Sequence, residues 1–104
     1  MRIYLSGAIT GTTDYLDRFD HYEQIFAAKG YSVVNPAKVC NNLPLMTHDE
    51  YMRICLTMLG CCDLIFAIPG WESSAGAREE LIWASRNGIM RIRLYEESEA
   101  NEDA

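Results

Sequence analysis

The chain has 104 residues, of which 49% are hydrophobic and 23% are charged, with a formal net charge of −6. This length predicts one domain with a modest core, and the composition excludes disordered and fibrous proteins. No apolar run approaches the roughly 20 residues of a membrane-spanning helix. Because Ser6 and Thr10 interrupt the first ten residues, the N-terminus does not resemble a signal peptide. We therefore expect a cytoplasmic protein that does not bind membranes.

The negative charge is concentrated at the C-terminus. Residues 96–104 hold five acidic side chains and no basic one, so they account for five of the six net negative charges. We predict a single domain over residues 1–95 and an acidic, disordered tail over 96–104. The domain is nearly neutral and lacks the basic surface of a protein that binds nucleic-acid polymers. A single nucleotide or nucleoside is still compatible with this charge.

Short apolar runs alternate with amphipathic stretches along the domain. The predicted elements are a strand at 2–6, a glycine-bearing loop at 7–11, a helix from Thr12 or Thr13 to about Lys29, a strand at 31–35, a loop at 37–46, a helix opened by a capping box at Thr47 and Glu50, a strand at 63–68, a helix at 74–87 and a strand at 89–94. This alternation predicts an α/β domain with a four-stranded parallel sheet and helices on both faces.

Ligands of such sheets bind at the carboxyl ends of the strands, where the strand order reverses. This rule selects the loops at 7–11, 35–36 and 69–76, and it places Asp63 at the opposite edge. The four cysteines show no C-x-x-C spacing and no matching histidine pair, so we expect reduced, mostly buried thiols, no metal and no cofactor.

The start of the helix at 74–87 carries the residues best placed for chemistry. Ser73, Ser74 and Gly76 adjoin a positive helix end with free backbone N–H groups, which suits a phosphate or a sugar hydroxyl, although Ser74 could serve only as the helix cap. Spacings of three and four place Ser73, Gly76 and Glu80 on one face. Glu80 borders apolar positions there, whereas Glu79 points about 100 degrees away and is expected in solvent.

Two segments resemble the nucleoside 2-deoxyribosyltransferase superfamily: Tyr4–Gly7 and the run Pro69–Glu80 with Ala84. The second segment has the G-W-E-x-S-x-G-A motif of a small bacterial and phage branch, domain of unknown function 4406, and the resemblance covers about residues 1–94. It implies a single flavodoxin-like domain, a homodimer or larger homo-oligomer, and a nucleoside or nucleotide as the small-molecule ligand.

The resemblance also implies roles for individual residues. Glu80, reached by the G-x-x-x-E spacing from Gly76, would attack the anomeric carbon and displace the base, forming a glycosyl ester that passes to another base or to water. The Ser6–Gly7 loop would contact the sugar or a phosphate. Ser73, Ser74 and Gly76 correspond to the sugar or phosphate loop of relatives that hydrolyse nucleoside monophosphates.

One position departs from the family pattern. Active relatives usually carry an aspartate eight residues before the strand-opening Asp63, and that position is Cys55 here. A thiol does not replace a carboxylic acid as the partner of a leaving base. Either another group such as Glu72 or Asp49 substitutes, or the protein binds nucleotides without turning them over. A structural module that dimerises is a third hypothesis.

The remaining candidates each allow two interpretations. Trp71 could stack on a base or form a lid or dimer contact, and Asn35 could bind the ligand or shape the turn before Pro36. His21 and His48 are expected to be solvated surface groups. Ile82 and Trp83 would suit a subunit interface if they are exposed.

Overall fold

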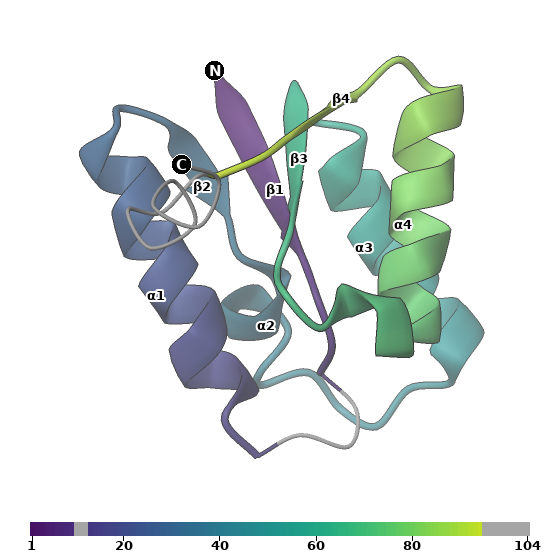
Figure 1. Cartoon of the computed structure of the whole chain (residues 1–104). Coiled ribbons are helices and arrows are strands. Elements are labelled where there is room, and N and C mark those ends of the chain that lie inside the picture. The colour runs from purple at the N-terminus through teal and green to yellow at the C-terminus, as the bar shows by residue number, and fades with distance from the viewer. Residues whose placement is uncertain (10–12, 95–104) are drawn as a thin grey trace.

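The computed structural model describes residues 1–9 and 13–94. Its sheet has the strand order β2-β1-β3-β4, and every neighbouring pair is parallel. The strands are β1 (Arg2–Ser6), β2 (Ser32–Val34), β3 (Leu64–Ala67) and β4 (Met90–Ile92). Helix α1 (Tyr15–Ala28) lies on one side of the sheet, while α3 (His48–Leu59) and α4 (Ala75–Arg86) lie on the other (Figure 1). This arrangement confirms the predicted flavodoxin-like α/β fold.

Two boundaries differ from the prediction. The expected loop at 37–46 begins with a short helix, α2 (Pro36–Val39), because Asn35 caps it and Pro36 occupies its first turn. Helix α1 begins at Tyr15 after Asp14, which makes no side-chain cap hydrogen bond. Thr12 and the acidic tail at 96–104 lie outside the described residues. Within those residues, no helix is long and apolar enough to cross a membrane.

The alternation of side chains along β1 divides the core into two layers. Ile3 and Leu5 pack with Phe19 and Phe26 of α1 on one face of the sheet. Tyr4 packs on the other face, in the cluster that includes Cys55 of α3. Because side chains of a strand alternate with period two, Ser6 shares the face of Tyr4. These two polar groups therefore point toward the layer of α3 and α4.

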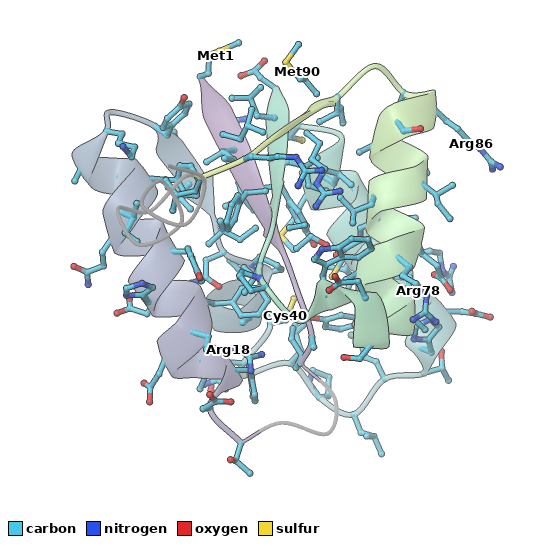
Figure 2. The ribbon with its side chains drawn as sticks, in the orientation of Figure 1. Met1, Arg18, Cys40, Arg78, Arg86 and Met90 are labelled. Carbon is cyan, nitrogen blue, oxygen red and sulfur yellow. The ribbon has the colours of Figure 1, made fainter. Side chains whose placement is uncertain are left out.

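The strand order reverses between β1 and β3, which are paired up to Ser6 and Ala67 at their carboxyl ends. The opposite edge is closed by Asp63, whose carboxylate accepts a hydrogen bond of 2.8 Å from the backbone N–H of Arg2. Figure 2 shows Met1 and Met90 at that amino edge, far from Cys40. The predicted position of Asp63 away from the site is thus confirmed, and the carboxyl edge is where the functional residues are to be sought.

Candidate active site

Glu80 is a buried carboxylate on the face of α4 that packs against the sheet. Its side chain is only 6% exposed, and the buried positions around it on the same helix are Ala77 and Ala84. These small side chains let α4 approach β1 closely, so the carboxylate reaches the sheet itself. An isolated buried charge is costly, so Glu80 requires polar partners.

Two hydroxyl groups of β1 provide those partners. The Tyr4 hydroxyl donates a hydrogen bond to Glu80 Oε2, and the Ser6 hydroxyl donates one of 2.7 Å to Glu80 Oε1. Tyr4 and Ser6 are both fully buried. They lie two residues apart on one face of the strand, so β1 presents two donors to the two oxygens of one carboxylate.

The protonation of Glu80 reflects a balance between burial and these hydrogen bonds. Burial raises its pKa to about 7, while the hydrogen bonds from Tyr4 and Ser6 oppose the rise and the nearby charge of Glu79 adds to it. A pKa near neutrality means that the carboxylate and the carboxylic acid are both populated at physiological pH. Groups with such a pKa are typical of acid–base and nucleophilic catalysis.

Glu80 lies in the wall of a cavity of about 70 Å³ at the carboxyl edge of β1. Its walls come from the β1–α1 loop, α1, α2, α3 and the first turns of α4. The lining residues are Gly7, Ile9, Phe19, Pro36, His48, Tyr51, Met52, Ser74, Gly76, Ala77 and Glu80. A cavity of this size holds only part of a small-molecule ligand, because whole ligand pockets span about 300–1,000 Å³.

A groove of about 540 Å³ adjoins the cavity. Ile9, His48 and Tyr51 belong to the walls of both. The other walls of this groove come from Cys40 and residues 43–47, including Pro44 and Met46. A ligand that places one end against Glu80 therefore has room to extend past His48 into the groove.

Two glycines line the cavity, and they have different roles. A Cβ atom on Gly7 would lie 3.0 Å from Cβ of Ile68 and 3.3 Å from Cζ of Phe19, so a side chain there would displace the core. A Cβ atom on Gly76 would lie 3.4 Å from Sδ of Met52, an ordinary contact. Gly7 is therefore needed for packing, whereas the absence of a side chain at Gly76 leaves free space at the site.

The serines that precede α4 separate into two roles. Gly70 adopts a left-handed conformation with φ of 96° and opens the short 3-10 helix η1 (Trp71–Ser73). Ser73 belongs to that turn and donates to the Gly70 carbonyl over 2.9 Å, so it does not share the face of Glu80. Ser74 caps α4 by accepting a hydrogen bond of 3.2 Å from Ala77 N–H, and it also lines the cavity.

Three further predicted ligand contacts, like Ser73, do not line the cavity. Asn35 caps α2 by accepting from Lys38 N–H and donates to Glu23 Oε1 over 3.0 Å. Trp71 carries the guanidinium of Arg91 over its ring at 5.0 Å. Glu72 is exposed, and its backbone carbonyl accepts a hydrogen bond from Arg78. The observed contacts of Asn35 and Trp71 are structural, and any ligand role for these three residues remains a prediction.

Cys55, where the family resemblance implies an aspartate, is fully buried. Burial raises its pKa to about 12, with a further rise from the charge of Glu80, although hydrogen bonds with Tyr4 and Tyr51 lower it. The thiol is therefore protonated at neutral pH. All four cysteines are free thiols. Among the described residues, no three His, Cys, Asp or Glu side chains gather as a metal site would require.

Three polar side chains near Glu80 received no site role from the sequence: Tyr4, which lies in the matched Tyr4–Gly7 segment, and His48 and Tyr51, which line the cavity. The period-two relation of Tyr4 to Ser6 was a usable signal for the first. His48, expected to be a solvated surface group, is half exposed, but it lines the cavity and its Nε2 lies 3.3 Å from Oε1 of Glu79. This contact joins α3 to α4, and residues 31 positions apart give no local pattern that predicts it.

The fold and the position of Glu80 together define the class of protein. This is a small doubly wound α/β protein with a buried glutamate at the point where the strand order reverses. Residues 1–92 match the family described as Domain of unknown function (DUF4406), and the chain belongs to that family.

A solved structure supports the fold. The 2-deoxyribosyltransferase of the psychrotolerant bacterium Bacillus psychrosaccharolyticus is similar to this chain, with a TM-score of 0.67 and 18% sequence identity over 97% of this chain and 81% of that one. The comparison with functionally curated proteins returns no match. The family membership and this likeness confirm the fold that the sequence motifs predicted.

Proposed function

We propose that this protein cleaves the N-glycosidic bond of a nucleoside or nucleotide, with Glu80 as the nucleophile. The observation that carries the proposal is the buried Glu80 carboxylate, which faces a cavity at the reversal point and is held by two hydroxyl donors. The similar solved structure is a 2-deoxyribosyltransferase described as a biocatalyst for the synthesis of nucleosides. A carboxylate that stabilises and then captures an oxocarbenium-like centre suits this bond.

In the proposed reaction, a Glu80 oxygen attacks the anomeric carbon while the bond from that carbon to the base breaks. The electron pair of the broken bond leaves with the base, and a glycosyl ester of Glu80 forms. Water then attacks the anomeric carbon and releases the sugar, or a second base attacks and yields a new nucleoside. Tyr4 and Ser6 hold the attacking carboxylate in one orientation, which lowers the entropic cost of the first step.

The sizes of the cavity and the groove suggest how the ligand lies. The 70 Å³ cavity accommodates the reacting part of the sugar beside Glu80, and the 540 Å³ groove has room for the base. Ser74 and Gly76, at the start of α4, border the sugar in this arrangement. The first turn of α4 offers a favourable environment for a phosphate on that sugar.

Base release measured by liquid chromatography tests the proposal. The panel contains ribo- and deoxyribonucleosides and their 5′-monophosphates, with a second free base present in half of the samples. We expect release by the wild-type protein and a loss of about 10³-fold or more in Glu80→Gln and Glu80→Ala. Asp17→Asn removes an exposed carboxylate of α1, on the other side of the sheet, and serves as the control. A base exchanged between sugars would identify a transferase, and release without exchange a hydrolase.

A second candidate is a protein that binds nucleotides without chemistry. Cys55 favours it, because this protonated, fully buried thiol stands where active relatives carry an aspartate. Calorimetric titration of the same panel separates the two functions. Binding that is equal in wild type and Glu80→Gln, with no base released, would identify a sensor or sequestering protein. No binding at all would leave a structural module.

We also propose a homo-oligomer that works in the cytoplasm. Ile82 is 52% exposed on α4 and offers an apolar contact for a second copy of the chain. The four free thiols fit a reducing compartment. Light scattering coupled to size exclusion measures the subunit number, and Ile82→Glu is expected to lower it.

A further inference from the structure

We propose that His48 gives a proton to the departing base, a role that rests on the function proposed above. A base that leaves as an anion is a poor leaving group, so its ring nitrogen must gain a proton as the glycosidic bond breaks. Glu72 and Asp49, the two carboxylates that the sequence offered for this task, do not line the cavity in the described structure. The proton must come from another side chain of the wall or from water.

Few side chains in the wall of the cavity can donate a proton to the base. Its titratable or hydroxyl-bearing side chains, among the described residues, are His48, Tyr51, Ser74 and Glu80. Glu80 is used as the nucleophile, and the Ser74 oxygen accepts the capping hydrogen bond from Ala77. Burial raises the pKa of Tyr51 well above its ordinary value, so this phenol holds its proton tightly. Imidazole is the side chain best suited to exchange protons near neutrality.

Two contacts restrict the position of His48, one on its backbone and one on its ring. It is the first residue of α3, directly after Thr47, whose capping box with Glu50 fixes the start of the helix through hydrogen bonds of 2.9 and 3.2 Å. Its Nε2 atom lies 3.3 Å from Oε1 of Glu79. A carboxylate that orients an imidazole is the arrangement that acid–base catalysis by histidine uses.

The position of the ring matches the place where the base would be. His48 belongs to the walls of both the cavity and the groove, so it stands where a ligand passes from one to the other. A Cβ atom on Gly76 would lie 3.9 Å from Cε1 of His48, and its absence leaves the space between the ring and α4 open. Glu79 and Glu80 are consecutive on α4, so one helix turn fixes both the nucleophile and the partner of the proton donor.

Cleavage of the glycosidic bond is coupled to transfer of one proton from His48. A Glu80 oxygen bonds to the anomeric carbon, the carbon–nitrogen bond breaks, and its electron pair stays on the base. The imidazolium of His48 transfers its proton to a ring nitrogen of that base, which leaves neutral. In hydrolysis, water adds its hydroxyl to the anomeric carbon, the ester bond returns its electrons to Glu80, and the second proton of water restores the imidazolium.

The role of His48 as proton donor can be tested with substrates whose base leaves without gaining a proton. The probes are guanosine and 2′-deoxyguanosine, each compared with its 7-methyl derivative, whose positively charged base leaves without protonation. We expect His48→Gln to lower kcat/KM by about 10²-fold or more for the unmethylated probes and by no more than about threefold for the methylated ones. Glu79→Gln should give a smaller loss with the same selectivity. Glu80→Gln should lose activity toward both the methylated and the unmethylated probes.

The control is His21→Gln, because His21 is the other histidine of the chain and lies exposed on α1. Spontaneous loss of the methylated bases is subtracted. Equal losses for methylated and unmethylated probes in His48→Gln would show a structural role and overturn the proposal, as would no loss at all. Wild-type protein that cleaves none of the four probes would overturn the proposed function for purine substrates, and the role of His48 with it.

Discussion

Two hydroxyl groups tune the charge of Glu80 at the scale of single residues. Tyr4 and Ser6 each donate a hydrogen bond to the carboxylate, and both bonds oppose the rise in pKa that burial causes. The side chain is thereby kept partly ionised in surroundings that would otherwise hold it protonated. In the reaction proposed above Glu80 attacks as a carboxylate, so these hydroxyls favour the form that the proposal requires.

Removing the Tyr4 hydroxyl should move the pH dependence of activity. The bond stabilises the ionised form of Glu80, so Tyr4→Phe raises the pKa of Glu80 above about 7. A hydrogen bond to a charged group contributes about 1.5–3 kcal/mol, which corresponds to a rise of roughly one pH unit or more. In the profile of kcat/KM for base release, the acidic limb should therefore shift upward by that amount. Ser6→Ala should shift it in the same direction.

The matched control for that experiment is Tyr31→Phe. Tyr31 packs against the cluster on the opposite face of the sheet, where it has no contact with Glu80. Its removal should leave the acidic limb in place. An acidic limb that does not move in Tyr4→Phe, despite normal folding, would show that Glu80 is not the group that titrates.

At the scale of one helix, Gly76 separates the stability of α4 from its function. An alanine Cβ there would lie 3.4 Å from Sδ of Met52 and 3.9 Å from both Cε1 of His48 and Oγ of Ser74, which are ordinary contacts. Replacing glycine by alanine within a helix stabilises it by about 0.5–1 kcal/mol. The same methyl group also takes up space beside His48 in a cavity of about 70 Å³. Gly76→Ala should therefore raise the midpoint of thermal unfolding and weaken nucleoside binding together.

Calorimetry and ligand titration on one preparation measure both effects. Ala77→Gly, at the next position of the same helix, is the converse control, and it should lower stability without filling the cavity. Tighter binding in Gly76→Ala would contradict the position of the ligand proposed here.

The start of α3 offers a second prediction at this scale. Thr47 accepts a hydrogen bond from Glu50 N–H, and the Glu50 side chain accepts one from Thr47 N–H. Thr47→Ala should cost about 1 kcal/mol of stability in chemical unfolding, since the capping hydrogen bond is lost. Thr57→Ala, on the exposed face of the same helix, should cost less. A larger loss in base release for Thr47→Ala than for Thr57→Ala would further support the positioning of His48.

The elements could be predicted where their signals are local. The capping box at Thr47 and the fully apolar run of β3 both gave correct elements, because each depends on residues that are close in sequence. Helix α2 was wrongly expected as a loop, because the Asn35–Pro36 start was interpreted as a turn. His48 is exposed at the start of α3, as expected, but its contact with Glu79 joins two helices that only the tertiary fold brings together, so no local pattern predicted it.

At the scale of the whole molecule, the strand order decides which groups meet. The chain crosses from β2 over β1 to β3, so α3 and α4 share one face of the sheet and α1 occupies the other (Figure 1). Tyr4 and Ser6 from β1, Glu80 from α4 and His48 from α3 converge only because of that crossing. The amino-acid spacing indicated Glu80, but the convergence of three elements required the topology.

A buried glutamate with a raised pKa also makes the stability of the whole domain depend on pH. The ordinary pKa of 4.5 applies to the unfolded chain, and the folded pKa is about 7. Between these values the folded state holds a proton that the unfolded state has released, so the free energy of unfolding falls as pH rises. The contribution is complete below pH 4.5 and is lost above about pH 7. Its size is at most about 3 kcal/mol, from 1.36 kcal/mol for each pH unit.

Glu80→Gln removes this titration while retaining the shape of the side chain. Chemical unfolding at pH 5 and at pH 8 should show the variant gaining stability relative to wild type as pH rises, by up to about 3 kcal/mol. The exposed Glu72→Gln is the control for losing one carboxylate. A constant difference for Glu80→Gln would show that burial does not hold the proton on Glu80. A gain in stability together with a loss of base release would show that the domain retains a destabilising charge because its chemistry requires one.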